Sequence, residues 1–288
     1  MQKGIIIKGI GGFYYVKTAE KEIIECKARG VFRKKKITPM VGDRVEVLEN
    51  NIDKIEERKN FMIRPPVANI DLLLVVVAAC SPDPNLFLID KLLTYAGILN
   101  IDAALCINKT DLKNGDELAD IYRSSGYKVI CVSGETGDNT EELKELLKDR
   151  ITAFCGLSGV GKSTLLNIIS DSEEEIKTGD LSQKIMRGKH TTRHVELLEL
   201  KDGGYVFDTP GFSSLELTEI TDIEAEELFE YFPEFVKDEC RFKTCVHINE
   251  PDCRVKEMVE NGEISSSRYE NYKEMYNILK NKKRNEYK

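Results

Sequence analysis

The first 60 residues alternate between short β-branched or aromatic segments and residues typical of turns. The segments are residues 4–10, 13–17, 22–26, 43–48 and 52–55. Paired glycines, a proline and paired asparagines separate them, as expected of strands joined by turns. About five short strands in this length predict a small β-barrel, for which an OB-fold is one architecture. The same periodicity also fits an SH3-like barrel.

Beyond Pro65 and Pro66 the pattern changes to strands that alternate with helices. Continuous apolar runs predict buried strands, and apolar residues spaced three or four apart predict helices. The predicted strands are residues 71–79, 101–107, 128–132, 151–155, 195–200 and 205–208, and the predicted helices are residues 86–96, 116–125, 140–149 and 162–169. This alternation predicts an α/β domain with a mostly parallel sheet covered by helices.

The strand pattern ends near residue 220. Two helical stretches, residues 223–231 and 267–283, then flank a segment rich in cysteine, histidine and asparagine. We therefore expect three domains, which are a β-barrel at residues 1–66, an α/β domain at residues 67–220 and a helical domain at residues 221–288.

The chain of 288 residues carries 42 Lys and Arg against 50 Asp and Glu, a net charge of −8. The longest apolar run, residues 72–80, is far shorter than the ~20 residues of a membrane-spanning helix. The first residues lack the apolar stretch of a signal peptide. We therefore expect a cytoplasmic protein that contacts no membrane and whose eight cysteines do not form a disulfide framework.

Positive charge is concentrated at the N-terminal end despite the acidic average. Residues 1–66 hold 15 Lys and Arg against 9 Asp and Glu, a local net charge of +6. The densest cluster runs from Arg33 to Lys36. A charged run of this kind is typical of a solvated loop, and it is also typical of contacts with nucleic-acid phosphates. The sequence leaves both interpretations open.

A glycine-rich segment follows the predicted strand at residues 151–155 and opens the predicted helix at residues 162–169. It reads Gly156, Leu157, Ser158, Gly159, Val160, Gly161, Lys162, Ser163 and Thr164. Its first eight residues fit the pattern G-x-x-x-x-G-K-[ST], in which backbone N–H groups and a helix N-terminus bind phosphates. Lys162 is expected to reach the β- and γ-phosphates, and Ser163 to bind Mg²⁺. A chance match is the alternative, and the strand–loop–helix context argues against it.

An aspartate ends a later predicted strand. Asp208 is followed by Thr209, Pro210 and Gly211. In P-loop nucleotide hydrolases an aspartate at such a strand end helps to hold the magnesium ion. Asp208 is therefore predicted to belong to a magnesium site, and a simple turn is the alternative.

A second strand end carries residues suited to the selection of a base. The residues that follow the predicted strand at 101–107 are Asn108, Lys109, Thr110 and Asp111. They stand where a parallel sheet binds its ligands, and they resemble the guanine-specificity pattern N-K-x-D of GTPases. In that pattern the aspartate accepts hydrogen bonds from guanine N1 and N2, which adenine cannot donate. An asparagine turn before a helix is the alternative. Ser133, also at a strand end, resembles the start of the loop that contacts guanine O6.

The order of these segments is unusual. In Ras-like GTPases the phosphate loop precedes the guanine-specificity segment, whereas here residues 108–111 and Ser133 precede Gly156. All the segments of such a domain are present, but the chain begins at a different point in their order. This arrangement defines a circular permutation. The chain thereby resembles the ribosome small subunit-dependent GTPase A (RsgA) family over essentially its whole length. The resemblance extends to residues 188–193 and to a cysteine–histidine cluster near the C-terminus.

The resemblance implies a circularly permuted P-loop GTPase domain between an OB-fold and a helical zinc-binding domain. It implies hydrolysis of GTP to GDP and phosphate, stimulated by the small (30S) ribosomal subunit during late maturation of that subunit. It also implies contacts with ribosomal RNA, a GTP-driven switch that controls release, and a monomeric protein. The implied GTP-binding residues are the four from Asn108 to Asp111, Ser133, the nine from Gly156 to Thr164, and Gly211.

The residue that orients the attacking water is not evident from the pattern. Ras-like enzymes place a glutamine just after the D-x-x-G element, and this position holds Phe212. His190, which follows the phosphate loop, is the candidate for orienting the water, and a solvated loop histidine is the alternative. Thr192 fits the threonine that completes the magnesium site, with Thr191 as the competing assignment. Lys162 is expected to assist catalysis at the phosphates.

Three cysteines and one histidine lie close together near the C-terminus. They are Cys240, Cys245, His247 and Cys253. Thiolate and imidazole ligands in this number favour a closed tetrahedral zinc site with a structural role. The alternative is burial of unrelated cysteines, against which polar neighbours such as Arg241, Lys243 and Asp252 argue.

Two other functions compete with that of a GTPase. An ATP-using P-loop enzyme would share the phosphate loop, and Asp111 argues against it. A non-enzymatic RNA-binding zinc protein would retain the fold, and the intact set of Lys162, Ser163, Thr192 and Asp208 argues against that interpretation.

Overall fold

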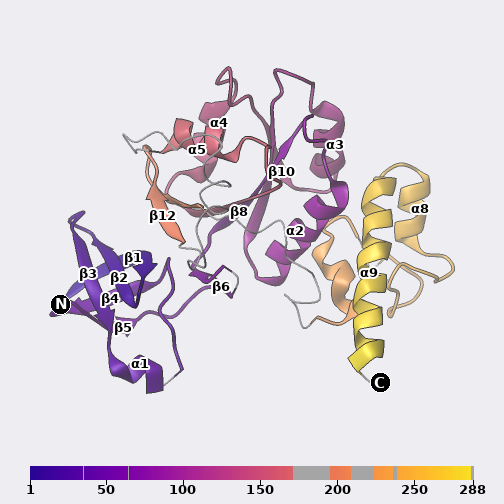
Figure 1. Cartoon of the computed structure of the whole chain (residues 1–288). Coiled ribbons are helices and arrows are strands. Elements are labelled where there is room, and N and C mark those ends of the chain that lie inside the picture. The colour runs from indigo at the N-terminus through magenta and orange to yellow at the C-terminus, as the bar shows by residue number, and fades with distance from the viewer. Residues whose placement is uncertain (35, 64, 171–194, 209–222, 236–238, 287–288) are drawn as a thin grey trace. The chain divides into compact units, whose positions relative to one another are not determined.

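The computed structural model describes residues 1–34, 36–63, 65–170, 195–208, 223–235 and 239–286 (Figure 1). The chain forms two compact units. The first unit comprises Met1–Leu73, Glu141–Phe154 and Lys162–Phe212, and the second comprises Leu74–Thr140, Cys155–Gly161 and Ser213–Lys288. The N-terminal strands therefore belong to the first unit, and the C-terminal helices belong to the second.

The first unit begins with a closed five-stranded barrel. Its strands are β1 (Gln2–Ile10), β2 (Phe13–Thr18), β3 (Ile23–Ala28), β4 (Arg44–Leu48) and β5 (Asn51–Ile55). They lie in the order β1-β2-β3-β5-β4, and antiparallel pairing of β1 with β4 closes the barrel. Successive side chains of a strand point to opposite faces, and the buried residues of these strands are Ile6, Val16, Thr18, Cys26, Val45, Val47 and Ile52. The predicted OB-like barrel is confirmed.

The sequence pattern does not predict the short helix that lies between β3 and β4. Helix α1 (Gly30–Lys34) includes the first two residues of the basic run, and the buried side chain of Phe32 anchors it. A helix this short shows no clear 3.6-residue periodicity, because that pattern needs several turns. Arg33 and Lys34 are exposed in its last turn, where positive charge is favourable beside the helix carbonyl groups.

Three further strands of the first unit lie beside the barrel. They are β11 (Ile151–Cys155), β13 (Tyr205–Asp208) and β12 (Glu196–Glu199), in the order β11-β13-β12. β11 and β13 are parallel, whereas β12 is antiparallel to β13. β12 also pairs with β1 at Lys8 and Glu196, whose side chains form an ion pair of 2.8 Å. This part also contains α4 (Thr140–Leu147), α5 (Lys162–Ile169) and a small sheet of β6 (Phe61–Met62) and β7 (Val67–Ala68).

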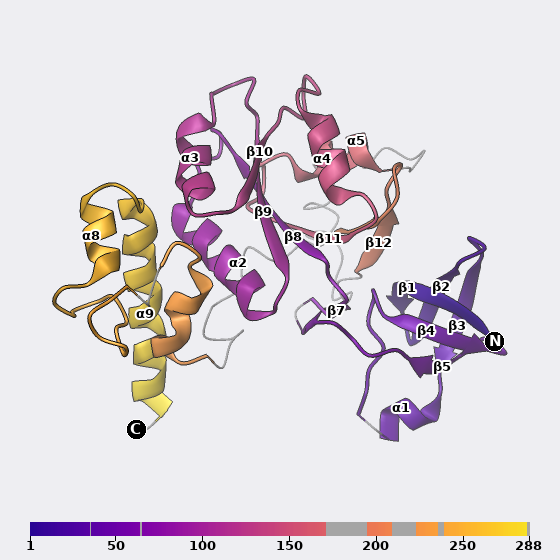
Figure 2. The ribbon, with the colours of Figure 1, turned by 180° about the vertical axis from the view of Figure 1, so that it is seen from behind.

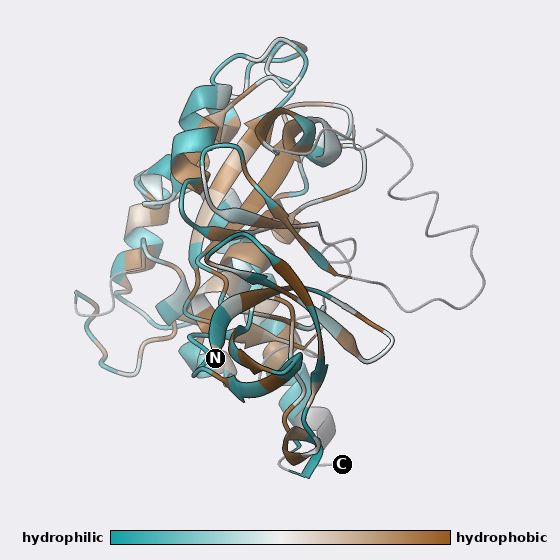
Figure 3. Cartoon of the chain, turned by 90° about the vertical axis from the view of Figure 1, so that its left-hand side faces the viewer, coloured by the Kyte–Doolittle hydropathy of each residue, from teal (hydrophilic) through white to brown (hydrophobic). Residues whose placement is uncertain are grey.

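The second unit contains β10 (Lys128–Cys131), β9 (Asp102–Asn108) and β8 (Leu72–Ala78), which lie side by side in this order. β10 and β9 are parallel, and every residue of β8 is buried, as its unbroken apolar run predicts. Helices α2 (Leu86–Ile98) and α3 (Asp116–Ser124) follow β8 and β9, and α2 lies beside β9 (Figure 2). Figure 3 shows apolar residues gathered on strands and polar residues on the outer faces of helices. The predicted alternation of strands and helices is confirmed.

The C-terminal part of the second unit is helical. It contains the 3₁₀ helix η2 (Ala225–Tyr231), α8 (Arg254–Glu260) and the long helix α9 (Ser266–Glu286). The Tyr272 ring lies edge-to-face with Phe232 and Phe235, at centroid distances of 5.2 and 4.8 Å. Helices on both sides of the cysteine-rich segment were expected, whereas α8 and the 3₁₀ geometry of η2 were not. Within the described ranges, no helix is both long and apolar enough to cross a membrane.

A buried arginine joins α9 to α2. The side chain of Arg268 is 1% exposed, and its guanidinium donates to Asp90 over 2.5 Å and to both carboxylate oxygens of Glu234 over 2.8 and 3.0 Å. Asn271 donates to the second oxygen of Asp90 over 2.6 Å. Burial alone lowers the pKa of Arg268, but the two carboxylates raise it above its usual value, so the guanidinium stays charged. The positive charge of Arg268 is therefore paired with the Asp90 and Glu234 carboxylates inside the protein.

Replacing this arginine should weaken the second unit strongly. Arg268→Met conserves much of the volume but leaves the Asp90 and Glu234 carboxylates without their cation. We expect the free energy of unfolding to fall by about 3–5 kcal/mol. Urea unfolding followed by circular dichroism measures the change.

The matched control is Lys283→Met, which removes an exposed ion pair with Glu224. Exposed pairs contribute about 0–1 kcal/mol, so this variant should unfold almost as the unsubstituted protein does. Equal losses in the two variants would contradict the role assigned to Arg268.

Candidate functional site

The glycine-rich loop between β11 and α5 is tightly packed. Gly156, Gly159 and Gly161 have φ angles of +139°, +81° and +93°, which side chains rarely allow. A Cβ atom on Gly156 would lie 2.0 Å from the carbonyl oxygen of Val76, and one on Gly161 would lie 2.2 Å from the amide nitrogen of Asn108. The loop can therefore adopt this path only with glycine at these positions.

Asn108, the last residue of β9, connects this loop to a second one. Its side chain is buried, and its amide nitrogen donates to the Val160 carbonyl oxygen over 2.9 Å. Its amide oxygen accepts from the Gly134 backbone N–H, also over 2.9 Å. A single side chain therefore holds the glycine-rich loop and the loop after β10 against the end of β9.

Asp111 and Ser133 bring two of these segments into direct contact. The Ser133 hydroxyl donates to an Asp111 carboxylate oxygen over 2.6 Å, and it accepts from the Thr136 backbone N–H over 3.1 Å. Asp111 is exposed, whereas Ser133 is fully buried. An exposed carboxylate whose orientation is set by a buried hydroxyl is suited to binding a ligand from solution.

Lys109 lies between these residues in an unusual backbone conformation. Its φ angle is +63°, in the left-handed region, and its ammonium group donates to the backbone carbonyl of Ser81. The Thr110 backbone N–H donates to the Val132 carbonyl over 3.2 Å. The segment that follows β9 is therefore held by both backbone and side-chain contacts.

The structure gathers most of the residues predicted for nucleotide binding. Asn108, Lys109, Thr110, Asp111, Ser133 and the loop from Gly156 to Gly161 all belong to the second unit. Lys162, Ser163 and Thr164 begin α5 directly after that loop, and Asp208 ends β13. His190, Thr191, Thr192, Gly211 and Phe212 lie outside the described residues.

Two residues beside Lys109 are absent from the sequence-based set. Ser81 and Pro82 follow β8, yet the pattern of apolar and polar residues does not single them out. Their position could have been noticed, because a proline-containing loop at the carboxyl end of a parallel strand stands where such sheets bind ligands.

The cysteine–histidine cluster forms in the C-terminal part of the second unit. The ligand atoms of Cys240, Cys245, His247 and Cys253 all lie within 4.8 Å of one another. The His247 Nδ1 atom is 3.4–3.6 Å from the three sulfurs, and Cys253 Sγ is 3.8 Å from that of Cys245 and 4.0 Å from that of Cys240. Zn–S and Zn–N bonds of about 2.3 and 2.0 Å give tetrahedral edges of about 3.5–3.8 Å. The four residues therefore fit one tetrahedral metal ion.

Aromatic groups enclose the histidine of this cluster. The rings of Phe229 and Phe235 lie edge-on to His247, with centroids 5.4 and 5.7 Å away. The Tyr269 hydroxyl donates to the His247 backbone carbonyl over 2.8 Å. His247 is completely buried with a φ angle of +61°, so its neighbours hold its backbone and ring in place.

Glu250 shapes the loop that carries the histidine. Its carboxylate accepts from the backbone N–H groups of Val246 and Ile248 over 2.9 Å and of Asn249 over 3.0 Å. Burial on its own raises the pKa of Glu250, but these donors outweigh it and the pKa is lowered. The ionised carboxylate therefore organises the turn between Cys245 and Cys253.

Comparison with known proteins decides the family. The RsgA GTPase model matches residues 55–218, and the RsgA N-terminal domain model matches residues 3–54. The chain belongs to the RsgA GTPase family. As a member of this family, it is a GTP hydrolase.

Curated RsgA relatives match along nearly the whole chain. The small ribosomal subunit biogenesis GTPase RsgA of Caldanaerobacter subterraneus is 49% identical, over 99% of this chain and 98% of its own length. The protein of the same name from Ruminiclostridium cellulolyticum is 51% identical, over 97% of this chain and 94% of its own length.

Solved RsgA-like structures share the fold. YjeQ from Thermotoga maritima superposes with a TM-score of 0.81 at 41% identity, covering 96% of this chain and 98% of its own. YloQ, described as a circularly permuted GTPase, superposes with a TM-score of 0.79 at 39% identity, covering 98% of this chain and 96% of its own. The predicted fold class is therefore confirmed: an α/β, circularly permuted P-loop GTPase domain follows a small barrel and precedes a helical part with a candidate metal site.

Removal of one ligand should abolish metal binding by this RsgA chain. Cys245→Ala leaves three of four ligands, and a structural metal contributes about 10–16 kcal/mol of apparent binding free energy in small zinc peptides. We expect residues 240–253 to unfold and the stoichiometric metal to be lost, while GTP affinity changes little. Elemental analysis and near-ultraviolet circular dichroism report the two effects.

The control for this substitution is Cys26→Ala, which removes a buried thiol inside the barrel. That variant should keep the metal. A metal content of zero in the freshly purified, unsubstituted protein would refute the assignment of the cluster.

Proposed function

We propose that this GTPase binds the small (30S) ribosomal subunit, hydrolyses GTP to GDP and phosphate on it, and acts in late maturation of the subunit. The names of the full-length relatives support the partner. The contacts of Asn108 support the nucleotide, because this side chain joins the three segments that bind a nucleotide in P-loop GTPases. It is the single observation that carries the site assignment.

The base would lie against the segments after β9 and β10. The Asp111 carboxylate accepts from guanine N1 and N2, and the Ser133 hydroxyl bonded to it keeps it in place. The stem of Lys109 covers one face of the base, and Thr110 and the loop after Ser133 complete the pocket. Adenine is rejected because it lacks the donors that Asp111 requires.

The phosphates would lie in the loop from Gly156 to Gly161. Its backbone N–H groups and those of the first turn of α5 donate to the phosphate oxygens, and Lys162 reaches the β- and γ-phosphates. Ser163, Thr192 and Asp208 are the residues proposed to hold Mg²⁺, which neutralises phosphate charge when bound. Thr164 and Gly211 complete the proposed GTP contacts.

His190 is the group proposed to orient the attacking water. The glutamine that serves this purpose in Ras-like enzymes is replaced by Phe212, which cannot form the hydrogen bond. A neutral imidazole can accept the proton of the water, and Lys162 stabilises the charge that develops on the phosphates.

The N-terminal barrel and the C-terminal helical part would form the docking surfaces. The barrel segment has a net charge of +6, and the Lys27 ammonium lies 4.8 Å from the centre of the exposed Phe13 ring. A cation beside an exposed aromatic ring on an OB-like barrel is suited to single-stranded RNA. The GTP-bound state would hold the subunit, and hydrolysis would release it.

The remaining assignments complete this proposal. The ion of the cysteine–histidine cluster is one structural Zn²⁺, since four ligands leave no position for a reacting water. The domains are residues 1–66, 67–220 and 221–288, and the protein works as a monomer in the cytoplasm. Single-turnover GTP hydrolysis with and without purified small subunits tests the proposed function. Equal hydrolysis rates under the two conditions would refute stimulation by the subunit.

Nucleotide choice should depend on Asp111. Asp111→Asn replaces an acceptor by an amide, which can donate to the additional oxygen of xanthine. We expect guanine nucleotides to bind at least tenfold more weakly, and xanthine nucleotides to bind better than in the unsubstituted protein. Competition titrations measure both affinities. Equal competition by ATP and GTP in the unsubstituted protein would show that the site is not guanine-specific.

Stimulated hydrolysis should depend on His190. His190→Ala is expected to keep GTP and subunit binding but to lose the stimulated rate by ~10²–10⁴, the range for a general base. Single-turnover hydrolysis with saturating subunits is the measurement. A rate within about threefold of the unsubstituted protein, far short of that loss, would exclude His190 and indicate a group supplied by the ribosome.

A further inference from the structure

The segment after β8 touches the side chain of Lys109. The Ser81 backbone carbonyl accepts a hydrogen bond from the Lys109 ammonium group. The backbone just before Ser81 is held against the end of β9 as well, because the Ala79 N–H donates to the Asn108 carbonyl over 2.8 Å. The carbonyl that receives the ammonium group is therefore placed by the same sheet that places Lys109.

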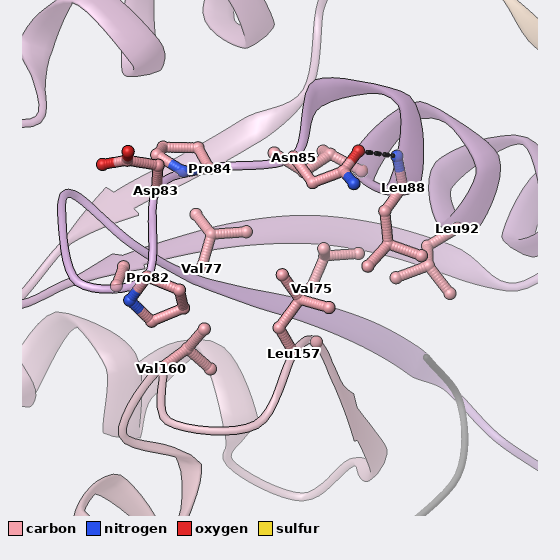
Figure 4. A pocket seen from close by; sticks show the side chains of 13 residues that line it. Val75, Val77, Pro82, Asp83, Pro84, Asn85, Leu88, Leu92, Leu157 and Val160 are labelled. Carbon is pink, nitrogen blue, oxygen red and sulfur yellow. Dashed lines mark hydrogen bonds between the residues drawn. The ribbon is translucent and has the colours of Figure 1, made fainter. Parts of the chain in front are cut away.

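Pro82 lies at the pocket that the glycine-rich loop also lines. A side chain on Gly159 would reach the Pro82 ring, because a Cβ atom built there would lie 3.8 Å from it. Pro82 and Val160 face each other across an apolar pocket that Leu157 also lines (Figure 4). The empty volume of this pocket is about 270 Å³, including its opening to solvent. The Pro82 ring therefore forms one wall of a pocket whose other walls include Leu157 and Val160 of the loop.

The far end of the segment is also held in place. The Asn85 side chain accepts from the Leu88 N–H over 2.9 Å and so caps the N-terminus of α2 (Figure 4). One turn further along α2, Asp90 is paired with the buried Arg268. Ser81 and Pro82 thus lie between the end of β8 and the start of an immobilised helix.

We propose that Ser81 and Pro82 are positioning residues for the bound guanine nucleotide. Pro82, at the pocket beside the glycine-rich loop, restricts the backbone that presents the Ser81 carbonyl to Lys109, whose stem is then held in place before the nucleotide arrives. This inference rests on the proposed role of Lys109 at the base. A flexible lysine loses freedom on binding, and a lysine held in advance loses less, so the nucleotide dissociates more slowly.

The dissociation rate of GDP carrying a fluorescent N-methylanthraniloyl group tests this inference. Pro82→Gly removes the ring and frees the backbone of the segment. We expect dissociation to become about tenfold faster, which corresponds to about 1.4 kcal/mol. Stopped-flow displacement by excess unlabelled GDP measures the rate, and thermal unfolding of the nucleotide-free protein should stay nearly unchanged.

A double-substitution cycle tells whether Pro82 acts by positioning Lys109 or only by making the segment more rigid. If Pro82 acts through Lys109, then Pro82→Gly should change the rate by less than about twofold once Lys109→Met is present. The matched control is Asp83→Ala, since Asp83 is exposed and its carboxylate points away from the pocket (Figure 4). It should leave the dissociation rate unchanged.

Three results would overturn the proposal. The first is an unchanged dissociation rate of labelled GDP in Pro82→Gly. If the glycine variant does not fold, Pro82→Ala replaces it in the same measurement. The second is an equal acceleration in the presence and absence of Lys109. Failure of the unsubstituted protein to bind labelled GDP is the third, and only this result would also refute the proposed nucleotide site.

Discussion

The two hydrogen bonds of the Asn108 amide are the contacts on which the arrangement of the candidate nucleotide site depends. Both are made in a buried place, where an unpaired amide or carbonyl group is costly, so the Val160 carbonyl and the Gly134 N–H are held as long as the amide is present. The close approach of this side chain to Gly161 leaves no room for a Cβ atom there. The buried Asn108 side chain therefore requires glycine at position 161 of the loop.

A second buried polar group organises the same unit at α2. Arg268 carries its charge into the interior because its guanidinium donates hydrogen bonds to the carboxylates of Asp90 and Glu234. An ion pair in this setting does not have to add stability over apolar packing, but it strongly disfavours any arrangement in which one partner is missing. It thus specifies how α9 lies against α2.

The cysteine–histidine cluster lies within the apolar core of the C-terminal part, which also contains Phe229, Phe235 and Tyr272. Its neighbours are aromatic rings and a carboxylate that binds three backbone N–H groups, so the ligand loop is held from several directions. Cys253 is also the residue before α8, which places the last ligand at the start of a helix. Aromatic packing and backbone hydrogen bonding therefore hold the four candidate ligands in place.

The sequence by itself determined the strand and helix order, the permuted order of the GTPase segments and the four residues of the cysteine–histidine cluster. These features rest on periodicity and on residue spacing, which are local properties of the chain. The sequence pattern did not predict the short helices α1 and α8, because they span too few turns for a 3.6-residue periodicity to show. The contacts of Ser81 with Lys109 and of Arg268 with Asp90, and the pocket that Pro82 shares with the glycine-rich loop, were decided only by the tertiary structure. They join residues far apart in the chain, and no local pattern of apolar and polar residues records which distant segments will meet.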